Sequence, residues 1–318
     1  MKIPAPPPAL IATIAKQTGL PHDPALDTLR DALRERYGDS LLAILFYGSC
    51  LRGGDPFDGL VDLYVIVDDY HKAFEKRRLA ILNTLLPPNV FYLEARHPQG
   101  VLRSKYAVLS RQDLHRGCAH WFHSYVWARF AQPTGLLYAR DQAATSQIHS
   151  SLGQAIMTFM ARVLPSLPPN FTIADIWEKG LGLTYRAELR VEKGQRGKEI
   201  YQHFETYFDE ITGLALTSFP GIHQANGNGA AFCQEPVARH QSLGNKAAWR
   251  LRIVQGKLLS VARLLKAFFT FEGGLDYLIW KLERHSGATI EITPRLRRYP
   301  LIFIWGLMWR LYRQGVFR

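Results

Sequence analysis

An acid that follows a glycine–serine turn is the feature of this chain best suited to chemistry on phosphates. Gly48 and Ser49 come after a short apolar run, residues 41–47, and Asp62 stands directly before a second one, residues 63–67. Glycine lets backbone N–H groups approach a phosphate closely, and serine adds a hydroxyl. A carboxylate on a neighbouring strand can hold the Mg²⁺ that bridges phosphate oxygens. We therefore predict that Gly48 and Ser49 bind a nucleotide, and that Asp62 and Ser49 are catalytic, with Mg²⁺ as the cofactor.

Lys105 adds a positive charge to this set. It lies within residues 102–109, which have the composition of a further strand. Beside a triphosphate its ammonium would act as a compact cation. At the edge of a sheet the same lysine would instead guard against aggregation. The residue type alone leaves both roles open.

The elements around these residues predict an α+β fold in which a mixed sheet with flanking helices is followed by a mostly helical C-terminal domain. Strand-length apolar runs and helical periodicity alternate as far as residue 142, and helical patterns dominate afterwards. Thr172 is expected to cap one of the later helices, and residues 221–245 predict a long loop. The expected parts are an irregular N-terminal arm (1–22), the sheet domain (23–142), a helical substrate domain (143–294) and a C-terminal amphipathic membrane-association segment (295–318).

Three stretches carry a family resemblance. They are FYGSC (46–50) followed by VDLYVIVDD (61–69), RSKYAVLS (103–110), and GLGLTYRAELRVEKG (180–194). In this order they resemble motifs of the mitochondrial-type phosphatidate cytidylyltransferases, also called the translocator assembly and maintenance family. That family lies within the nucleotidyltransferases of the DNA polymerase β type. The chain looks like a bacterial member.

The resemblance implies a nucleotidyltransferase-type fold and an enzyme that depends on CTP and Mg²⁺. The implied reaction transfers CMP from CTP to phosphatidate and gives CDP-diacylglycerol and pyrophosphate in phospholipid biosynthesis. It also implies roles for residues inside the matching motifs. Lys105 would be catalytic, and Lys105 and Tyr106 would bind the nucleotide. Tyr185, Glu188 and Arg190 would contact the substrate, although Glu188 replaces the aspartate of the family.

One departure affects the metal site. The superfamily places two acids on the second strand, but Leu60 stands where the partner of Asp62 is expected. A further carboxylate must come from elsewhere, or the site uses fewer. Glu94 on a third predicted strand and Asp58 in the preceding loop are the candidates, with Asp55 as a rival. We predict Asp62, Glu94 and Asp58 as the metal ligands.

The charge of the chain points to an anionic partner. The formal net charge is +12, which suits nucleic acid, a nucleotide or an acidic membrane surface. Residues 246–270 predict a helix in which Leu251, Val254, Leu258, Val261, Leu265 and Phe268 form one buried stripe. Its cations would then face outward, and we predict that Arg252 and Lys257 bind substrate phosphate. Base-stacking aromatics are not interleaved with these cations, so nucleic acid is not an expected partner.

The C-terminal segment predicts attachment to an anionic membrane surface. Arginines bracket the apolar residues 299–309, which are too few to span a bilayer. The alternative is a C-terminal helix packed on its own domain. The N-terminal residues lack the pattern of a signal peptide, and three scattered cysteines suit a reducing compartment. We expect a peripheral protein on the cytoplasmic face of a bacterial inner membrane, with the oligomeric state open.

Two other functions are compatible with the sequence. The first is a soluble nucleotidyltransferase that modifies a small molecule, a protein or the end of an RNA. The second is a non-catalytic binding module on a degenerate nucleotidyltransferase fold, for which Leu60 is the best support. A soluble enzyme would have no use for the C-terminal segment, and a binding module would have no need of Mg²⁺ with CTP.

Overall fold

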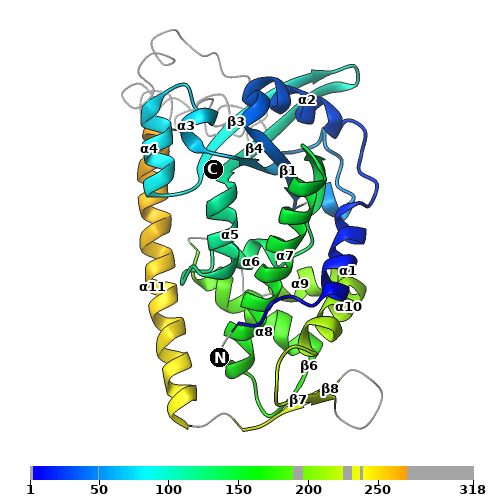
Figure 1. Cartoon of the computed structure of the whole chain (residues 1–318), viewed down its shortest axis with the longest axis vertical. Helices are drawn as coiled ribbons and strands as arrows, with labels where there is room; N and C mark the ends of the chain where they lie inside the picture. Colours follow the sequence, from blue (N-terminus) through cyan, green and yellow to red (C-terminus); the bar gives the residue numbers. More distant parts are fainter. Residues whose placement is uncertain (1–2, 49, 189–195, 225–230, 237–238, 271–318) are drawn as a thin grey trace, which may run out of the picture.

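The computed structural model describes residues 3–48, 50–188, 196–224, 231–236 and 239–270 (Figure 1). Within them the helices are α1 (Pro8–Thr18), α2 (Leu26–Tyr37), α3 (Tyr70–Ala73), α4 (Arg77–Leu85), α5 (Arg111–Ala119), α6 (Trp127–Phe130), α7 (Gln142–Val163), α8 (Ile173–Arg186), α9 (Arg196–His203), α10 (Glu205–Leu216) and α11 (Arg239–Thr270). The strands are β1 (Leu41–Tyr47), β2 (Val61–Val67), β3 (Asn89–His97), β4 (Gly100–Ser110), β5 (Gly135–Ala139), β6 (Asn170–Thr172), β7 (Ile222–Gln224) and β8 (Ala231–Gln234).

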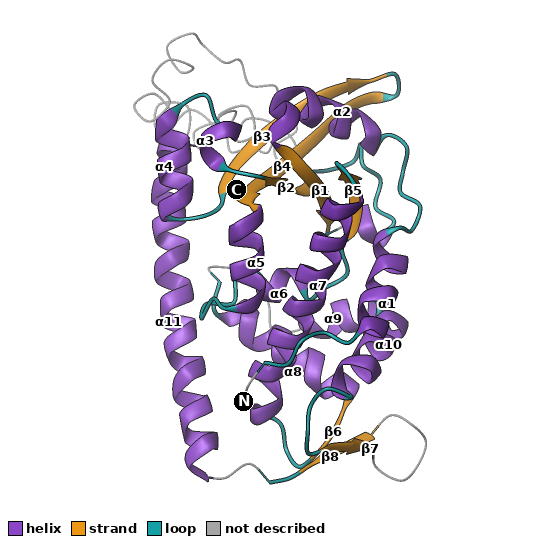
Figure 2. Ribbon diagram, viewed as in Figure 1, coloured by secondary structure: helices purple, strands orange, loops and turns teal. Residues whose placement is uncertain are grey.

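A mixed sheet forms one end of the molecule. Its five strands lie in the order β3-β4-β2-β1-β5, with β2 and β4 parallel and the other neighbouring pairs antiparallel. Helices flank this sheet, and most of the chain after β5 is helical (Figure 2). A second sheet, β6-β8-β7, lies at the far end. The predicted α+β class, with a mixed sheet, flanking helices and a helical C-terminal part, is confirmed.

The two faces of the large sheet bury two separate cores, because side chains alternate along each strand. Ile44, Leu63 and Tyr106 point into a core shared with α2 and α4. Leu45 and Tyr64 point the other way, into a larger core shared with the helical part. The sheet is therefore sandwiched between local helices and the later helices of the chain.

The N-terminal residues are not an irregular arm, as the sequence predicted. They form α1, which packs on α7 and α10 in the helical part. Leu10 and Ile14 are buried there, and Thr13 Oγ1 donates a hydrogen bond to Glu210 Oε1 at 2.9 Å. Apolar positions four residues apart outweigh the prolines, which lie before and at the first turn of the helix, where proline is tolerated.

Several predicted boundaries also change. The helix expected over residues 70–86 is two helices, α3 and α4. The stretch 221–245, expected to be a loop, contains β7 and β8 and the first residues of α11. The predicted cap is confirmed: Thr172 and Asp175 form a reciprocal capping box at the start of α8.

Helix α11 faces the opposite way from the prediction. The stripe expected to be buried is exposed, with Leu251, Val254, Leu258 and Leu265 between 54% and 66% accessible. Two of the cations expected outside, Arg252 and Lys266, point inward instead, whereas Lys257 is exposed as expected. Arg252 is 1% accessible and Lys266 is 8% accessible. The side chain of Phe268 lies outside the described residues.

Carbonyl groups and aromatic rings explain the inward cations. Lys266 Nζ donates to the carbonyls of Leu86 and Pro88 at 2.5 and 2.8 Å, and Arg263 Nε donates to the Pro87 carbonyl at 3.0 Å. These carbonyls follow α4 and need donors, which buried cations supply. Burial, together with the charge of Arg263, lowers the pKa of Lys266 to about 7.

Within the described residues, none of the helices combines the length and apolarity that crossing a bilayer requires. The predicted C-terminal segment, residues 295–318, lies outside the described residues. The predicted domain boundaries beyond the N-terminal arm stay predictions.

Candidate functional site

A row of polar side chains crosses the large sheet on one face. Tyr47 on β1 is paired with Asp62 on β2, Asp62 with Lys105 on β4, and Lys105 with Tyr92 on β3. Residues directly opposite each other on paired strands share a face of the sheet. The pairing of two predicted strands, β2 and β4, thus brings Asp62 and Lys105 together although 43 residues separate them along the chain.

Asp62 and Lys105 form an open ion pair. Lys105 Nζ lies 3.4 Å from Asp62 Oδ1, and the two side chains are 39% and 29% accessible. A pair this accessible is only weakly held, so both groups can exchange partners with a bound ligand. The carboxylate offers a ligand for a cation, and the ammonium offers one for a phosphate.

Gly48 holds the turn against the carboxylate. Its φ of +83° lies in the left-handed region that favours glycine. A Cβ at this position would stand 3.3 Å from Asp62 Oδ2. The backbone of the turn therefore lies against the acid, as the sequence predicted. Ser49, the other predicted residue of the turn, lies outside the described residues.

The three predicted metal ligands do not come together. Glu94 is on β3, two strands away from Asp62, which is roughly 10 Å at normal strand spacing. It accepts hydrogen bonds from Tyr92 and from Arg103, at 2.7 and 3.2 Å. Asp58 is exposed in the loop before β2. In the described part of the chain, no three His, Cys, Asp or Glu side chains gather into a metal site.

Tyr106 does not reach the row either. It follows Lys105 on β4 and therefore points to the opposite face of the sheet. Its side chain is fully buried, and its ring lies 5.4 Å from that of Phe91. The predicted contact between Tyr106 and a nucleotide at this row is corrected to a role in the core.

Arg129 on α6 is a residue that the sequence analysis missed. Its guanidinium carbon lies 4.8 Å from the centre of the Tyr47 ring, and the side chain is partly buried. Burial acts to lower the pKa of Arg129, but Tyr47 and Glu188 outweigh it and raise the pKa well above the usual value. No signal in the sequence marks Arg129, because only the tertiary structure places α6 beside β1.

Tyr185 and Glu188 lie on the same side of the molecule as this row. Both act electrostatically on Arg129, which joins them to Tyr47 and so to the row of Asp62. Helix α11 closes over this point: a Cβ on Gly256 would stand 2.4 Å from the Ala187 carbonyl oxygen. Only glycine allows this approach, so Gly256 fixes the end of α8 and the start of the segment with Glu188. Arg190 lies outside the described residues.

The two substrate ligands predicted on α11 are elsewhere. Arg252 donates from Nε to the Phe122 carbonyl at 2.6 Å, and its guanidinium lies 4.5 Å from the ring centres of Phe122 and Trp249. It is a buried core residue and cannot meet a ligand there. Lys257 is exposed on the outer side of α11.

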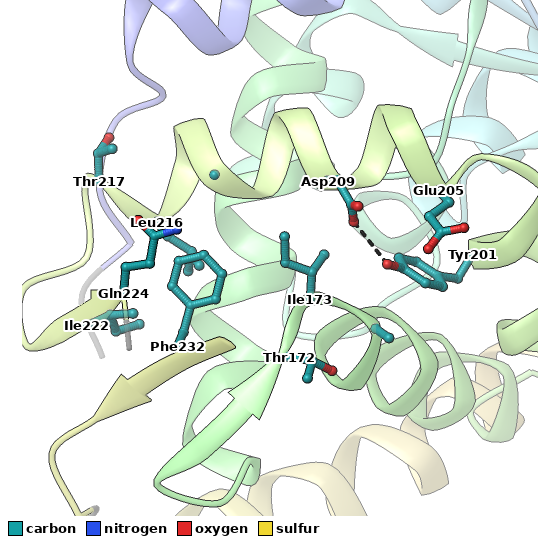
Figure 3. Close-up of a pocket in the computed structure, with 12 residues that line it drawn as sticks. Thr172, Ile173, Tyr201, Glu205, Asp209, Leu216, Thr217, Ile222, Gln224 and Phe232 are labelled. Carbon is teal, nitrogen blue, oxygen red and sulfur yellow. Dashed lines mark hydrogen bonds between the residues drawn. The ribbon is translucent and has the colours of Figure 1, made fainter. Parts of the chain in front are cut away.

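A cavity of about 710 Å³ opens in the helical part (Figure 3). Tyr201 on α9 donates a hydrogen bond to Asp209 Oδ1 on α10 at 2.9 Å, with Glu205 nearby. Ile173 and Phe232 form its apolar side. Its lining contains two carboxylates and no lysine or arginine, so it is unsuited to a triphosphate. We therefore place the candidate site at the row of Asp62.

Comparisons with known proteins give two distant similarities. No family model matches the chain. The chain is similar to the mitochondrial phosphatidate cytidylyltransferase of Bos taurus, with 22% identity over 185 residues, and spans about half the length of that relative, 54%. A solved nucleotidyltransferase-like protein from Exiguobacterium sibiricum 255-15 matches 92% of each chain with 14% identity and a TM-score of 0.28. The sequence similarity supports a relation to nucleotidyltransferases and leaves the particular member open.

Proposed function

We propose that this protein is a phosphatidate cytidylyltransferase. It would transfer CMP from CTP to phosphatidate, giving CDP-diacylglycerol and pyrophosphate. The observation that carries the proposal is the carboxylate of Asp62 between the Gly48 turn and the ammonium of Lys105. Nucleotidyl transfer needs this combination of a close backbone approach, an anionic metal ligand and a cation. The similarity to the bovine enzyme supports the choice of CTP and phosphatidate within that wider class.

The donor set fits Mg²⁺ with one protein carboxylate. Mg²⁺ in nucleotide sites keeps several waters and takes one or two carboxylates together with substrate phosphates. Asp62 is partly exposed and pairs with Lys105 at 3.4 Å, so its oxygens can serve as ligands. A bound Mg²⁺ would neutralise charge on the triphosphate. Because Leu60 stands where a second acid is expected, Asp62 is the carboxylate that β2 contributes.

The reaction needs little acid–base catalysis from the protein. An oxygen of the phosphatidate phosphate attacks the α-phosphorus of CTP and forms the new O–P bond. The bond from the α-phosphorus to the bridging oxygen breaks, and its electron pair leaves with pyrophosphate. Phosphate monoesters have a second pKa near 6, so the nucleophile is already ionised at neutral pH. The protein contributes orientation and charge neutralisation.

The side chains around the row would divide this work. Lys105 neutralises charge on the triphosphate beside the turn that holds Gly48 and Ser49. Arg129 offers its N–H groups to a phosphate, with Tyr47 holding the guanidinium in place. Tyr185 and Glu188 approach from the helical part and border the lipid phosphate. Arg190 stays a proposed ligand on the same segment.

The partners follow from this reaction. Phosphatidate is a membrane lipid, so the protein would work as a peripheral protein at an anionic membrane, on the cytoplasmic face of a bacterial inner membrane. The net charge of +12 is consistent with attraction to such a surface. Nucleic acid is not proposed as a partner.

A product assay tests the proposal. Full-length protein is incubated with radiolabelled CTP, Mg²⁺ and phosphatidate vesicles, and the lipid phase is extracted and counted. We expect labelled CDP-diacylglycerol from the unaltered chain and none from Asp62→Asn, which keeps the size of the side chain. Transfer of label to a soluble acceptor instead of lipid would favour the soluble nucleotidyltransferase. Label that remains entirely in CTP, with the fold intact, would favour a binding module.

A further inference from the structure

Exposed apolar side chains gather on one side of the molecule. Eleven large apolar side chains are exposed in the described residues, and all of them except Leu20 lie on two helices. They are Leu243, Leu251, Val254, Leu258, Val261, Leu264, Leu265 and Phe269 on α11, and Ile81 and Leu85 on α4. Helix α4 packs beside the C-terminal half of α11 (Figure 1). We call the exposed side of α11 the outer face.

The outer face continues along most of a long helix. From 251 to 269 its residues recur at spacings of three and four, and Leu243 lies eight residues before Leu251, which keeps them on one side of an α-helix. A helix of 32 residues is about 48 Å long at the usual rise. Contiguous apolar surfaces of this kind on soluble proteins mark sites of contact with a partner or a membrane.

The helix cannot rotate to bury this face. Its inner side is fixed by Trp249 and Arg252 in the core, and by Lys266 on the carbonyls that follow α4. Rotation would leave these cations and carbonyls without partners. The outward direction of the apolar residues is therefore a property of the folded chain.

Positive charge borders the outer face and negative charge is missing. Lys246, Arg250 and Lys257 are exposed and lie at relative positions 0, 4 and 11, which places them along one edge of the apolar stripe. No Asp or Glu occurs between residues 239 and 270. An apolar stripe with a basic edge is the pattern of helices that lie in the interface of anionic membranes.

We propose that the outer face of α11 docks on an anionic lipid bilayer. Leu258, Leu265 and their neighbours enter the boundary between headgroups and acyl chains. Lys246, Arg250 and Lys257 lie at the lipid phosphates. The helix rests in the plane of the membrane. This surface is separate from residues 295–318, which the sequence analysis predicted as the membrane segment, and it does not depend on the chemistry at Asp62.

The basic edge of the outer face favours an anionic bilayer over a second copy of the chain or its C-terminal residues as the occupant. A second copy of the chain would bring a net charge of +12 and the same basic edge. The C-terminal residues 271–318 contain eight Lys or Arg and four Asp or Glu, so they too are net positive. Both would meet like charges at the edge of the outer face, whereas anionic lipid meets opposite ones.

Vesicle flotation of the full-length protein tests the proposal. Vesicles contain either phosphatidylcholine alone or phosphatidylcholine with phosphatidylglycerol. Leu258→Asp is compared with Leu20→Asp, a matched control because Leu20 is also apolar and exposed, 66% against 53%. We expect Leu258→Asp to lower the bound fraction on anionic vesicles at least tenfold, and Leu20→Asp to bind like the unaltered chain. Equal binding of both variants would overturn the proposal.

Two further arms identify the occupant. Arg250→Glu with Lys257→Glu is expected to weaken binding to anionic vesicles, and equal binding of the unaltered chain to neutral and anionic vesicles would refute the role of charge. Size-exclusion chromatography with light scattering reports the second copy: a dimer that Leu258→Asp dissociates would replace the bilayer as the occupant. Asp62→Asn is expected to float normally, so loss of catalysis and loss of docking are distinguishable.

Discussion

Two regions with conspicuous lysines and arginines differ in where these charges point. At the row of Asp62, Lys105 stays 39% accessible beside an accessible carboxylate. On α11, Arg252 and Lys266 are buried, and they satisfy carbonyls and aromatic rings of the same chain. The first region keeps its charges available to a ligand. The second uses them to hold a helix in place.

A helix rich in lysine and arginine is therefore not by itself a basic surface. Burying a cation is costly unless hydrogen bonds or rings replace its water. The chain offers such partners to α11 at Phe122 and at residues 86–88. The apolar side of the helix stays exposed. Substitutions at four sites test this contrast.

Asp62→Ala removes the carboxylate at the row. We expect CDP-diacylglycerol formation to fall more than about 100-fold, as in sites that lose a key electrostatic group. The melting temperature should stay close to that of the unaltered chain, because Asp62 is partly exposed. Glu94→Gln is the control, since Glu94 is bound to Tyr92 and Arg103. An equal loss in both variants would restore Glu94 to the site.

Arg252→Ala tests the buried side of the contrast. The substitution leaves a cavity between two aromatic rings and removes a donor from the Phe122 carbonyl. We expect the free energy of unfolding in urea to fall by about 3 kcal/mol. The KM for CTP should not change in the folded fraction. A raised KM for phosphatidate at unchanged stability would show that Arg252 binds substrate after all.

Lys105→Met and Lys257→Met remove one exposed lysine from each of the two regions, so their effects on catalysis can be compared. Loss of the ammonium beside Asp62 should lower kcat/KM for CTP by about 10- to 100-fold, or about 1.4 to 2.7 kcal/mol. Lys257→Met should leave it unchanged when phosphatidate is supplied in detergent micelles. Similar effects of the two substitutions would mean that the sheet lysine has no special part in catalysis.

The smallest expected effect is that of His123 on how the free energy of unfolding changes with pH. Burial and then the charge of Arg263 lower its pKa from 6.5 to about 4. The unfolded chain therefore takes up the proton first, and the free energy of unfolding falls as the pH drops from 6.5 to 4. Allowing for screening of a partly exposed group, this is about 1 kcal/mol. His123→Gln should reduce the change in melting temperature between pH 6.5 and pH 4. If that change stays the same, other groups cause the pH dependence.

The sequence predicted the local elements well where periodicity and length agreed. The strands around Asp62 and the helix cap at Thr172 are found as expected. It also predicted that Gly48 lies close to Asp62, because Gly48 directly follows one strand and Asp62 lies at the start of the next. It failed on Tyr106 and Glu94, because the face and the spacing of a residue depend on which strands become neighbours. Arg129 carried no signal at all.

The order of apolar and polar residues along the chain was enough to determine the α+β class, the turn at Gly48 and the amphipathic character of α11. These follow from side-chain periodicity and backbone sterics, which act between residues close in sequence. The tertiary structure alone decided that Lys105 meets Asp62, that Arg129 lies over Tyr47, and that α11 turns Arg252 and Lys266 inward. Those outcomes depend on partners far away in the chain, and an amphipathic pattern is compatible with either orientation until the partners are in place.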